Sequence, residues 1–494
     1  MRRTALVILI ALAALISSAA AQRLTIASNG NPPTLDPHAT FNGLTFGITN
    51  QVYETLVRLN SDSEVVPHLA TAWEYPDANT LRLTLRDGVT FHDGSPLDAA
   101  AVVASLERFL DPEATRPGRF VLTAVSEARV VDDLTVDIVT SSPFAPLLAH
   151  LAHPVTAIVP TATAADLSRS PVGSGPFQFV SWSDNSEVVL EAYPDYWGGA
   201  PAIEEVVVRI IPEVSTQVVE LRTGGVDLVF NLPADSLANL QDDDSLSSAT
   251  FPGWGTHLFG FNSANPKLTD VRVRRALSHA IDKELIAEEL LRGLASPAVS
   301  PIPPTVAYSV DLPEAYPYDP ERARELLAEA GVSDLNLRLD VYQNADLEAI
   351  AQVLQFAFSE IGVDLEIRVQ PYAAYAEDVV KDDLELFMSG WGTVTLDADY
   401  SLYAFFHSGE IPGNNTSRFS DENVDALLEE ARANPDSQVR ADNYRQVQEI
   451  ALAADTLDAL VYPLSSYVKN PRLQGEVVSF SWIDLNLRDA TLSD

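Results

Sequence analysis

The segment SGWGTVTLDADY, residues 389–400, gathers an aromatic ring, hydroxyls and carboxylates within a few positions. Its candidate functional residues are Trp391, Gly392, Thr393, Val394, Thr395, Asp397 and Asp399. The pattern fits a metal loop, a pair of catalytic carboxylates, or the wall of a ligand cleft that combines apolar surface with a few polar groups. A purely structural role is the alternative, with Trp391 in a core and Asp399 as the N-cap of a helix that begins near Tyr400.

Support for a metal or a catalytic site is weak elsewhere in the sequence. The eight histidines are scattered, and the close pair His150 and His153 has no acidic neighbour. Leu402 occupies the glycine position that an EF-hand loop requires. Ser174 lacks the spacing of a nucleophile elbow, and no phosphate-loop or dinucleotide motif occurs. We therefore predict no metal, no cofactor and no enzymatic activity, with a secreted hydrolase that uses Asp397 and Asp399 as the competing hypothesis.

Alternating strands and well-capped helices surround these residues and indicate an α/β fold. Residues 22–28, 79–91, 187–193 and 203–212 read as strands. Ser95 and Asp319 are predicted N-caps of two helices, and residues 270–293 read as one amphipathic helix that ends at Gly293. Residues 335–342, 346–361 and 363–370 form a strand–helix–strand unit, which is typical of α/β sheets.

The first residues and the composition indicate an exported protein. Residues 1–21 combine Arg2 and Arg3, an apolar run from Ala5 to Ile16 and a small-residue cleavage site, as in a secretory signal peptide. The chain has no cysteine, so the sequence predicts no disulfide and no lipid anchor of the bacterial lipoprotein kind. The formal charge of −39 argues against nucleic acid as a partner. We expect a periplasmic protein with two or more lobes.

Several motifs, in a fixed order along the chain, resemble the family 5 extracellular solute-binding proteins, which serve dipeptide, oligopeptide, nickel and glutathione importers. The motifs are PTLDPH (33–38), LATAWEYPDANTLRLTLRDGVTFHDGSPL (69–97), PVGSGPFQF (171–179), DYWGG (195–199), GGVDLVFNLP (224–233), FNSANPKLTDVRVRRALSHAIDKELI (261–286), YDPERARELLAEAG (318–331) and Gly390-Trp391. They cover essentially the whole chain after residue 21.

The resemblance implies a two-lobed clamp of the type II, cluster C periplasmic-binding-protein class. The first lobe would hold residues 22–255 and 470–494, with an inserted subdomain over about 57–170, and the second lobe residues 256–469. The chain would cross between the lobes near Phe259–Asn262 and Tyr462–Lys469. Such a clamp closes on a ligand that touches both lobes, and the loaded, monomeric protein would then engage the permease of an ABC importer.

The resemblance also suggests which residues contact the ligand. In peptide-binding relatives the segment after Gly-Trp lines the cleft, and an Asp three residues after Trp holds the ligand's ammonium; here Val394 takes that position. No Arg follows the strand that ends at Tyr342, where dipeptide binders carry their carboxylate clamp, and the pattern is similar to the glutathione-binding branch. Further expected cleft residues are Asn31, Pro32, Trp254 and Tyr467. The predicted ligand is a dipeptide, oligopeptide or glutathione, with an oligosaccharide or a nickel chelate as alternatives.

Overall fold

A continuous β-sheet of 12 strands runs through the protein. The computed structural model describes residues 22–493 except 61, 162–165, 242, 382, 476 and 479–484, so the predicted signal peptide lies outside the described residues. The strand order is β16-β15-β17-β13-β18-β11-β1-β10-β9-β8, and β12 and β14 also pair with β18. These strands are β1 Arg23–Ser28, β8 Phe177–Ser183, β9 Glu187–Ala192, β10 Glu205–Ile210, β11 Leu228–Phe230, β12 Ser247–Pro252, β13 Gly255–Phe261, β14 Ala295–Pro297, β15 Leu335–Tyr342, β16 Val363–Gln370, β17 Leu386–Gly392 and β18 Leu457–Lys469.

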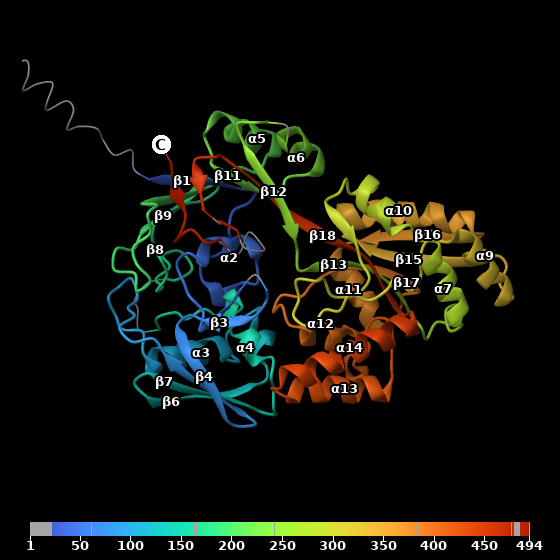
Figure 1. The fold of residues 1–494 in the computed structure, drawn as a ribbon, viewed down its shortest axis with the longest axis horizontal. Coiled ribbons are helices and arrows are strands. Elements are labelled where there is room, and N and C mark those ends of the chain that lie inside the picture. Colours follow the sequence, from blue (N-terminus) through green and yellow to red (C-terminus); the bar gives the residue numbers. More distant parts are fainter. Residues whose placement is uncertain are drawn as a thin grey trace, which may run out of the picture.

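Strand β18 joins the two halves of the sheet, which form two lobes (Figure 1). Its first residues pair with β13, and its last residues pair with β11 and β12. Because β12 pairs with the far half of β18 and β13 pairs with β17 from Gly255 onward, the chain changes lobe at Gly253-Trp254. This is earlier than the Phe259–Asn262 crossing expected from the sequence. The return crossing lies within β18, inside the region expected for it.

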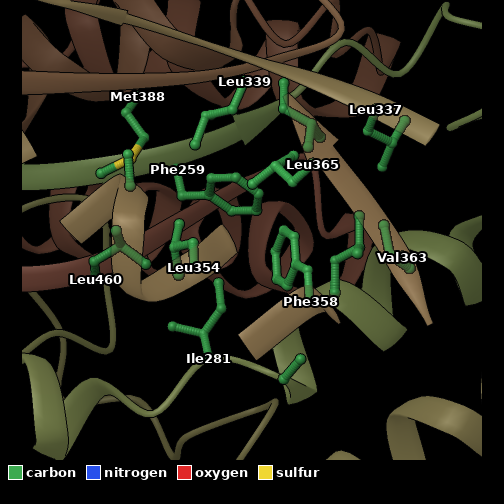
Figure 2. Packing of buried hydrophobic residues seen from close by; sticks show 14 of the residues in the cluster. Phe259, Ile281, Leu337, Leu339, Leu354, Phe358, Val363, Leu365, Met388 and Leu460 are labelled. Carbon is green, nitrogen blue, oxygen red and sulfur yellow. The ribbon is translucent and has the colours of Figure 1, made fainter. Parts of the chain in front are cut away.

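The second lobe packs helices against β13 and β15–β17. The predicted strand–helix–strand unit is confirmed, since β15 and β16 pair in parallel on either side of α10 in the sequence. Its core contains Phe259, Leu354, Phe358 and Met388 (Figure 2). The helices of this lobe are α7 Val271–His279, α8 Lys283–Leu285, the π-helical segment η4 Ile286–Leu290, α9 Pro320–Glu329, α10 Ala345–Glu360, α11 Tyr372–Lys381, α12 Ala398–Phe406, η5 Ser408–Glu410, α13 Glu422–Ala433 and α14 Ser437–Ala454.

The first lobe carries a separate four-stranded sheet of order β4-β5-β7-β6, covered by α3. This sheet lies inside the range of about 57–170 that the sequence suggested for an inserted subdomain. The remaining elements of this lobe are η1 Pro37–Ala39, α2 Gly43–Thr49, β2 Val57–Leu59, β3 Val65–Pro67, β4 Ala70–Asp77, β5 Thr80–Leu85, α3 Ala99–Leu110, η2 Arg119–Leu122, β6 Val125–Asp132, β7 Thr135–Thr140, α4 Leu147–His150, η3 Pro154–Thr156, α5 Val214–Thr223, α6 Ala234–Gln241, β19 Leu473–Gln474 and β20 Thr491–Leu492.

Two helix predictions need correction. Residues 270–293 do not form one helix: α7 ends at His279, and Asp282 caps a new segment by accepting a hydrogen bond from the N–H of Leu285 (2.9 Å). Ser95 is not an N-cap. Its carbonyl accepts from the N–H of Phe91 (2.8 Å), which holds it in a loop, and Asp98 caps α3 instead. The Asp319 cap of α9 is confirmed. Over the described ranges, no helix has the length and apolar character needed to cross a membrane.

Candidate functional site: a cleft between the lobes

A cleft of about 890 Å³ lies where the two lobes meet. Its volume falls in the range of about 300–1,000 Å³ that is common for small-molecule sites. Both lobes contribute residues to the lining of this cleft. The lining includes Phe41, Phe46, His153, Asp235, Trp254, His257, Arg292, Asp346, Trp391, Gly392 and Val394. A molecule held there would touch both lobes at once.

Two tryptophans form the part of the wall next to the crossing. Trp391 lies near the end of β17, and its indole N–H donates to the Ser401 hydroxyl (2.9 Å), which fixes the plane of the ring. Trp254 lies against Gly392, where a Cβ would be only 2.2 Å from its Cζ3 atom. Gly392 is therefore required for the contact, because any larger residue would displace the Trp254 ring. The structure brings four of the predicted residues, Trp391, Gly392, Val394 and Trp254, together in the lining of this cleft.

A series of ring contacts connects the lobes beside the tryptophans. Phe41 stacks on His153 with centroids 5.0 Å apart and contacts Phe120 at 5.1 Å. Phe120 then contacts Tyr400 of the second lobe at 6.2 Å, and Tyr400 contacts Trp391 at 5.6 Å. Burial lowers the pKa of His153 to about 3, with a further lowering by the nearby His150, so the imidazole is neutral. His153 thus serves the cleft as an uncharged aromatic surface.

The threonines of the segment are buried behind this wall. The Thr393 hydroxyl shares a hydrogen bond with Ser401 (2.7 Å), and its N–H donates to the Trp254 carbonyl (2.9 Å). The Thr395 hydroxyl has no hydrogen-bond partner among the residues that the structure describes. Neither threonine belongs to the described lining of the cleft. Thr393 shares the Ser401 hydroxyl with Trp391, and Trp391 and Val394 are the residues that line the cleft.

The two carboxylates lie in buried ion pairs. Asp397 accepts from the Arg440 guanidinium at 2.7 and 3.0 Å, and Asp399 accepts from Arg432 at 2.9 and 3.0 Å. The Tyr444 hydroxyl also donates to Asp399 (3.3 Å). Removing one partner of a buried pair typically costs about 3–5 kcal/mol, so engagement by a ligand ammonium would have to overcome a loss of that size.

The same carboxylates define the start of α12. The N-cap is Asp397, whose side chain accepts from the N–H of Asp399 (2.9 Å), rather than Asp399 as the sequence suggested. Asp399 lies in the first turn, where its charge also interacts favourably with the helix dipole. The structure places both residues as supports of the cleft segment.

The other expected cleft residues lie elsewhere. The Asn31 side-chain oxygen accepts from the Trp182 indole (3.3 Å) and the Asn185 N–H (3.1 Å), which ties it to the β8–β9 hairpin. Pro32 is buried next to it. Tyr467 packs against Phe230 and Phe251, with centroids 6.5 and 6.1 Å away. None of the three predicted residues belongs to the described lining of the cleft.

Four charged or titratable cleft residues did not appear among the sequence predictions. Asp235 of α6 and Arg292, just after η4, form an ion pair across the cleft, one from each lobe. His257 of β13 and Asp346 of α10 lie 3.8 Å apart, between Nε2 and an Oδ atom. Asp346 had a signal in the sequence, since it follows shortly after the strand that ends at Tyr342, in the segment where the family resemblance implies a clamping arginine.

The weaker catalytic and metal candidates have structural partners. Ser174 is fully buried and donates to Glu54 (2.8 Å), while His150 contacts the Val121 carbonyl oxygen (2.6 Å). His153 accepts from the Val155 N–H (3.1 Å). In the part of the chain that the structure describes, no group of three or more His, Asp or Glu side chains is placed to hold a metal ion.

Comparison with known proteins gives concordant matches across the chain. Residues 64–413 match the model of the bacterial extracellular solute-binding proteins, family 5 Middle. The glutathione-binding protein GsiB of Salmonella paratyphi A is 30% identical over 447 residues, covering 87% of each chain.

Two solved structures extend the likeness to the fold. The structure of HbpA2 from Haemophilus parasuis superposes with a TM-score of 0.89 at 27% identity, over 95% of this chain and 100% of that one. The periplasmic binding protein DppA from Helicobacter pylori in complex with the peptide STSA gives a TM-score of 0.78 at 26% identity, over 96% of this chain and 98% of that one. The chain therefore belongs to family 5 of the bacterial extracellular solute-binding proteins, the two-lobed periplasmic binding proteins that work with ABC importers.

Proposed function

We propose that this protein captures a peptide-like small solute, of the dipeptide, oligopeptide or glutathione class, and delivers it to the permease of an ABC importer. The observation that carries the proposal is a single cleft lined from both lobes by aromatic rings and by charges of both signs. Aromatic faces supply contact area at low entropic cost, and separated charges suit a zwitterion. The names of the relatives GsiB and DppA, which concern glutathione and a peptide, favour the same class.

Within this function, the residues of the Trp391 segment have two roles. Trp391, Gly392, Val394 and Trp254 contact the solute, because they line the cleft. Thr393, Thr395, Asp397 and Asp399 hold that wall in place through buried contacts. Val394 stands where a relative's ammonium-binding Asp is expected, so the solute's amine binds elsewhere in the cleft or is absent.

The proposed function also includes the extent of the two lobes, the location of the protein and its monomeric state. The predicted lobes, residues 22–255 with 470–494 and residues 256–469, are kept with their limits moved to the crossings at Gly253-Trp254 and within β18, and the subdomain at about 57–170 is inserted in the first. The protein acts in the periplasm as a monomer after removal of residues 1–21, without a lipid anchor, and it binds its solute without chemical conversion.

The test is calorimetric titration of the purified protein with dipeptides, oligopeptides, glutathione, oligosaccharides and nickel chelates. We expect binding by a member of the peptide class, and Trp391→Ala should weaken it about 10- to 100-fold because a large anchoring ring is lost. Trp73→Ala is the matched control, since Trp73 is a half-buried tryptophan of β4 in the four-stranded sheet. If only oligosaccharides or nickel chelates bound, the proposed ligand class would be wrong. If Trp391→Ala and Trp73→Ala changed binding equally, Trp391 would not contact the solute.

A further inference from the structure

His257 presents an unusual polar surface in the wall of the cleft. It lies on β13 opposite Gly390 of β17, and only 9% of the residue is exposed. Neither ring nitrogen has a hydrogen-bond partner within the described residues. Buried polar groups are normally hydrogen-bonded, and those that are not often mark a site that something else completes. Because His257 lines the cleft, a molecule bound in the cleft can supply the missing hydrogen-bond partner of the imidazole.

Asp346 provides the nearest charge. Its carboxylate lies 3.8 Å from Nε2 of His257, which is too long for a direct hydrogen bond, and 59% of its side chain is exposed. An aspartate with this exposure is ionised at neutral pH. The α10 N-terminus does not need Asp346 as its cap, because the Asn344 side chain accepts from the N–H groups of Asp346 and Leu347 (3.1 Å each).

The other charged pair of the cleft is already complete. Asp235 and Arg292 neutralise each other across the lobes, and His153 is uncharged. Among the charged residues described in the cleft lining, the unneutralised negative charge is thus that of Asp346, beside an imidazole whose nitrogens have spare hydrogen-bonding capacity. This arrangement attracts a cation that can also donate hydrogen bonds.

We propose that Asp346 and His257 form an amine-binding subsite, in which the primary ammonium of the solute donates to the Asp346 carboxylate and to a ring nitrogen of His257. An ammonium group carries three N–H donors, and a donor atom placed between the two side chains spans their 3.8 Å separation. The inference rests on the proposed function and adds to it the residues that select for a free amine. The Asp346 carboxylate supplies the charged contact to the solute's amine that Val394 cannot make.

The experiment compares solutes with free and acetylated amines. Wild-type protein, Asp346→Asn and Asp364→Asn are titrated calorimetrically with glutathione, alanyl-alanine and the N-acetylated form of each. Asp364 is the control because it is an exposed aspartate of the neighbouring β16 strand, outside the described cleft lining. We expect wild type and Asp364→Asn to prefer the free amine of whichever solute binds by about 10- to 100-fold, the effect of one charged hydrogen-bonded contact.

The Asp346→Asn variant should lose that preference by weakening only the free-amine form. Asp346→Glu, which keeps the charge, should retain much of it, and His257→Gln should reduce it. A preference caused merely by the bulk of the acetyl group would persist in Asp346→Asn and would overturn the inference. Equal binding of both forms by wild type would overturn the inference and leave the proposed function standing, whereas failure of every peptide-class solute to bind would overturn both.

Discussion

At the residue scale, the cleft segment depends on ion pairs that lie beneath it. Asp399 is 1% exposed and receives two hydrogen bonds from Arg432, whose guanidinium also lies 3.1 Å above the centroid of the Tyr403 ring. Because the surroundings exclude water, removing the carboxylate leaves the arginine charge buried without its partner.

We expect Asp399→Asn to lower stability by about 3–5 kcal/mol. The control is Asp184→Asn, which removes an exposed pair with Arg169 at a cost of about 0–1 kcal/mol. The measurement is the midpoint of thermal unfolding for both variants and wild type. Equal midpoints for the two variants would show that Asp399 does not stabilise the segment.

The residue types of the segment predicted what each side chain can bind, but not its partner. Trp391 and Val394 were expected in a cleft wall and line the cleft. Asp397 and Asp399 were candidates either for the same wall or for a helix cap, yet they pair with arginines on α13 and α14, far along the chain. A local sequence pattern does not show which distant arginine pairs with a carboxylate. The sequence alone therefore could not distinguish a ligand contact from a buried ion pair at Asp397 and Asp399.

At the element scale, the passage from β12 to β13 packs closely against β18 at the lobe crossing. A Cβ on Gly253 would lie 2.7 Å from the carbonyl oxygen of Pro463 in β18, and that backbone cannot yield without moving the sheet. A Cβ on Gly255, two residues later, would lie 3.4 Å from the Trp391 carbonyl oxygen, an ordinary contact.

We therefore predict that Gly253→Ala lowers the midpoint of thermal unfolding and weakens solute binding, while Gly255→Ala stays near wild type. Both properties can be measured on the two variants side by side. If Gly255→Ala proved as damaging as Gly253→Ala, the close approach at Gly253 would not explain the effect.

Elements were predictable where local signals act alone. The β15–α10–β16 unit and the Asp319 cap followed from periodicity and capping residues. The interrupted helix at 280–282 and the displaced cap at Ser95 did not, because nearby capping residues, Asp282 and Asp98, start the helical segments later in the chain. The position of the lobe crossing at Gly253-Trp254 depends on strand pairing between distant segments, and hydrophobic periodicity does not predict such pairing.

At the scale of the whole molecule, the described contacts between the lobes combine aromatic contacts, such as Phe120 on Tyr400, with a few polar ones. The Ala145 N–H donates to the Arg432 carbonyl (2.7 Å), Ser63 donates to the Thr305 carbonyl, and Asp235 pairs with Arg292. Exposed pairs of this kind contribute about 0–1 kcal/mol each, so the arrangement of the lobes can respond to a solute that touches both. The family resemblance, more than any single pattern, predicted this two-lobed organisation.

The central claim is that a solute binds between the lobes and favours their closed arrangement. The direct measurement is small-angle X-ray scattering of the purified protein with and without a saturating peptide-class solute that binds in titration. The account predicts a smaller radius of gyration in the presence of the solute, since a ligand that contacts both lobes stabilises the closed state by its differential affinity. An unchanged radius of gyration at saturation, with the solute bound, would contradict it.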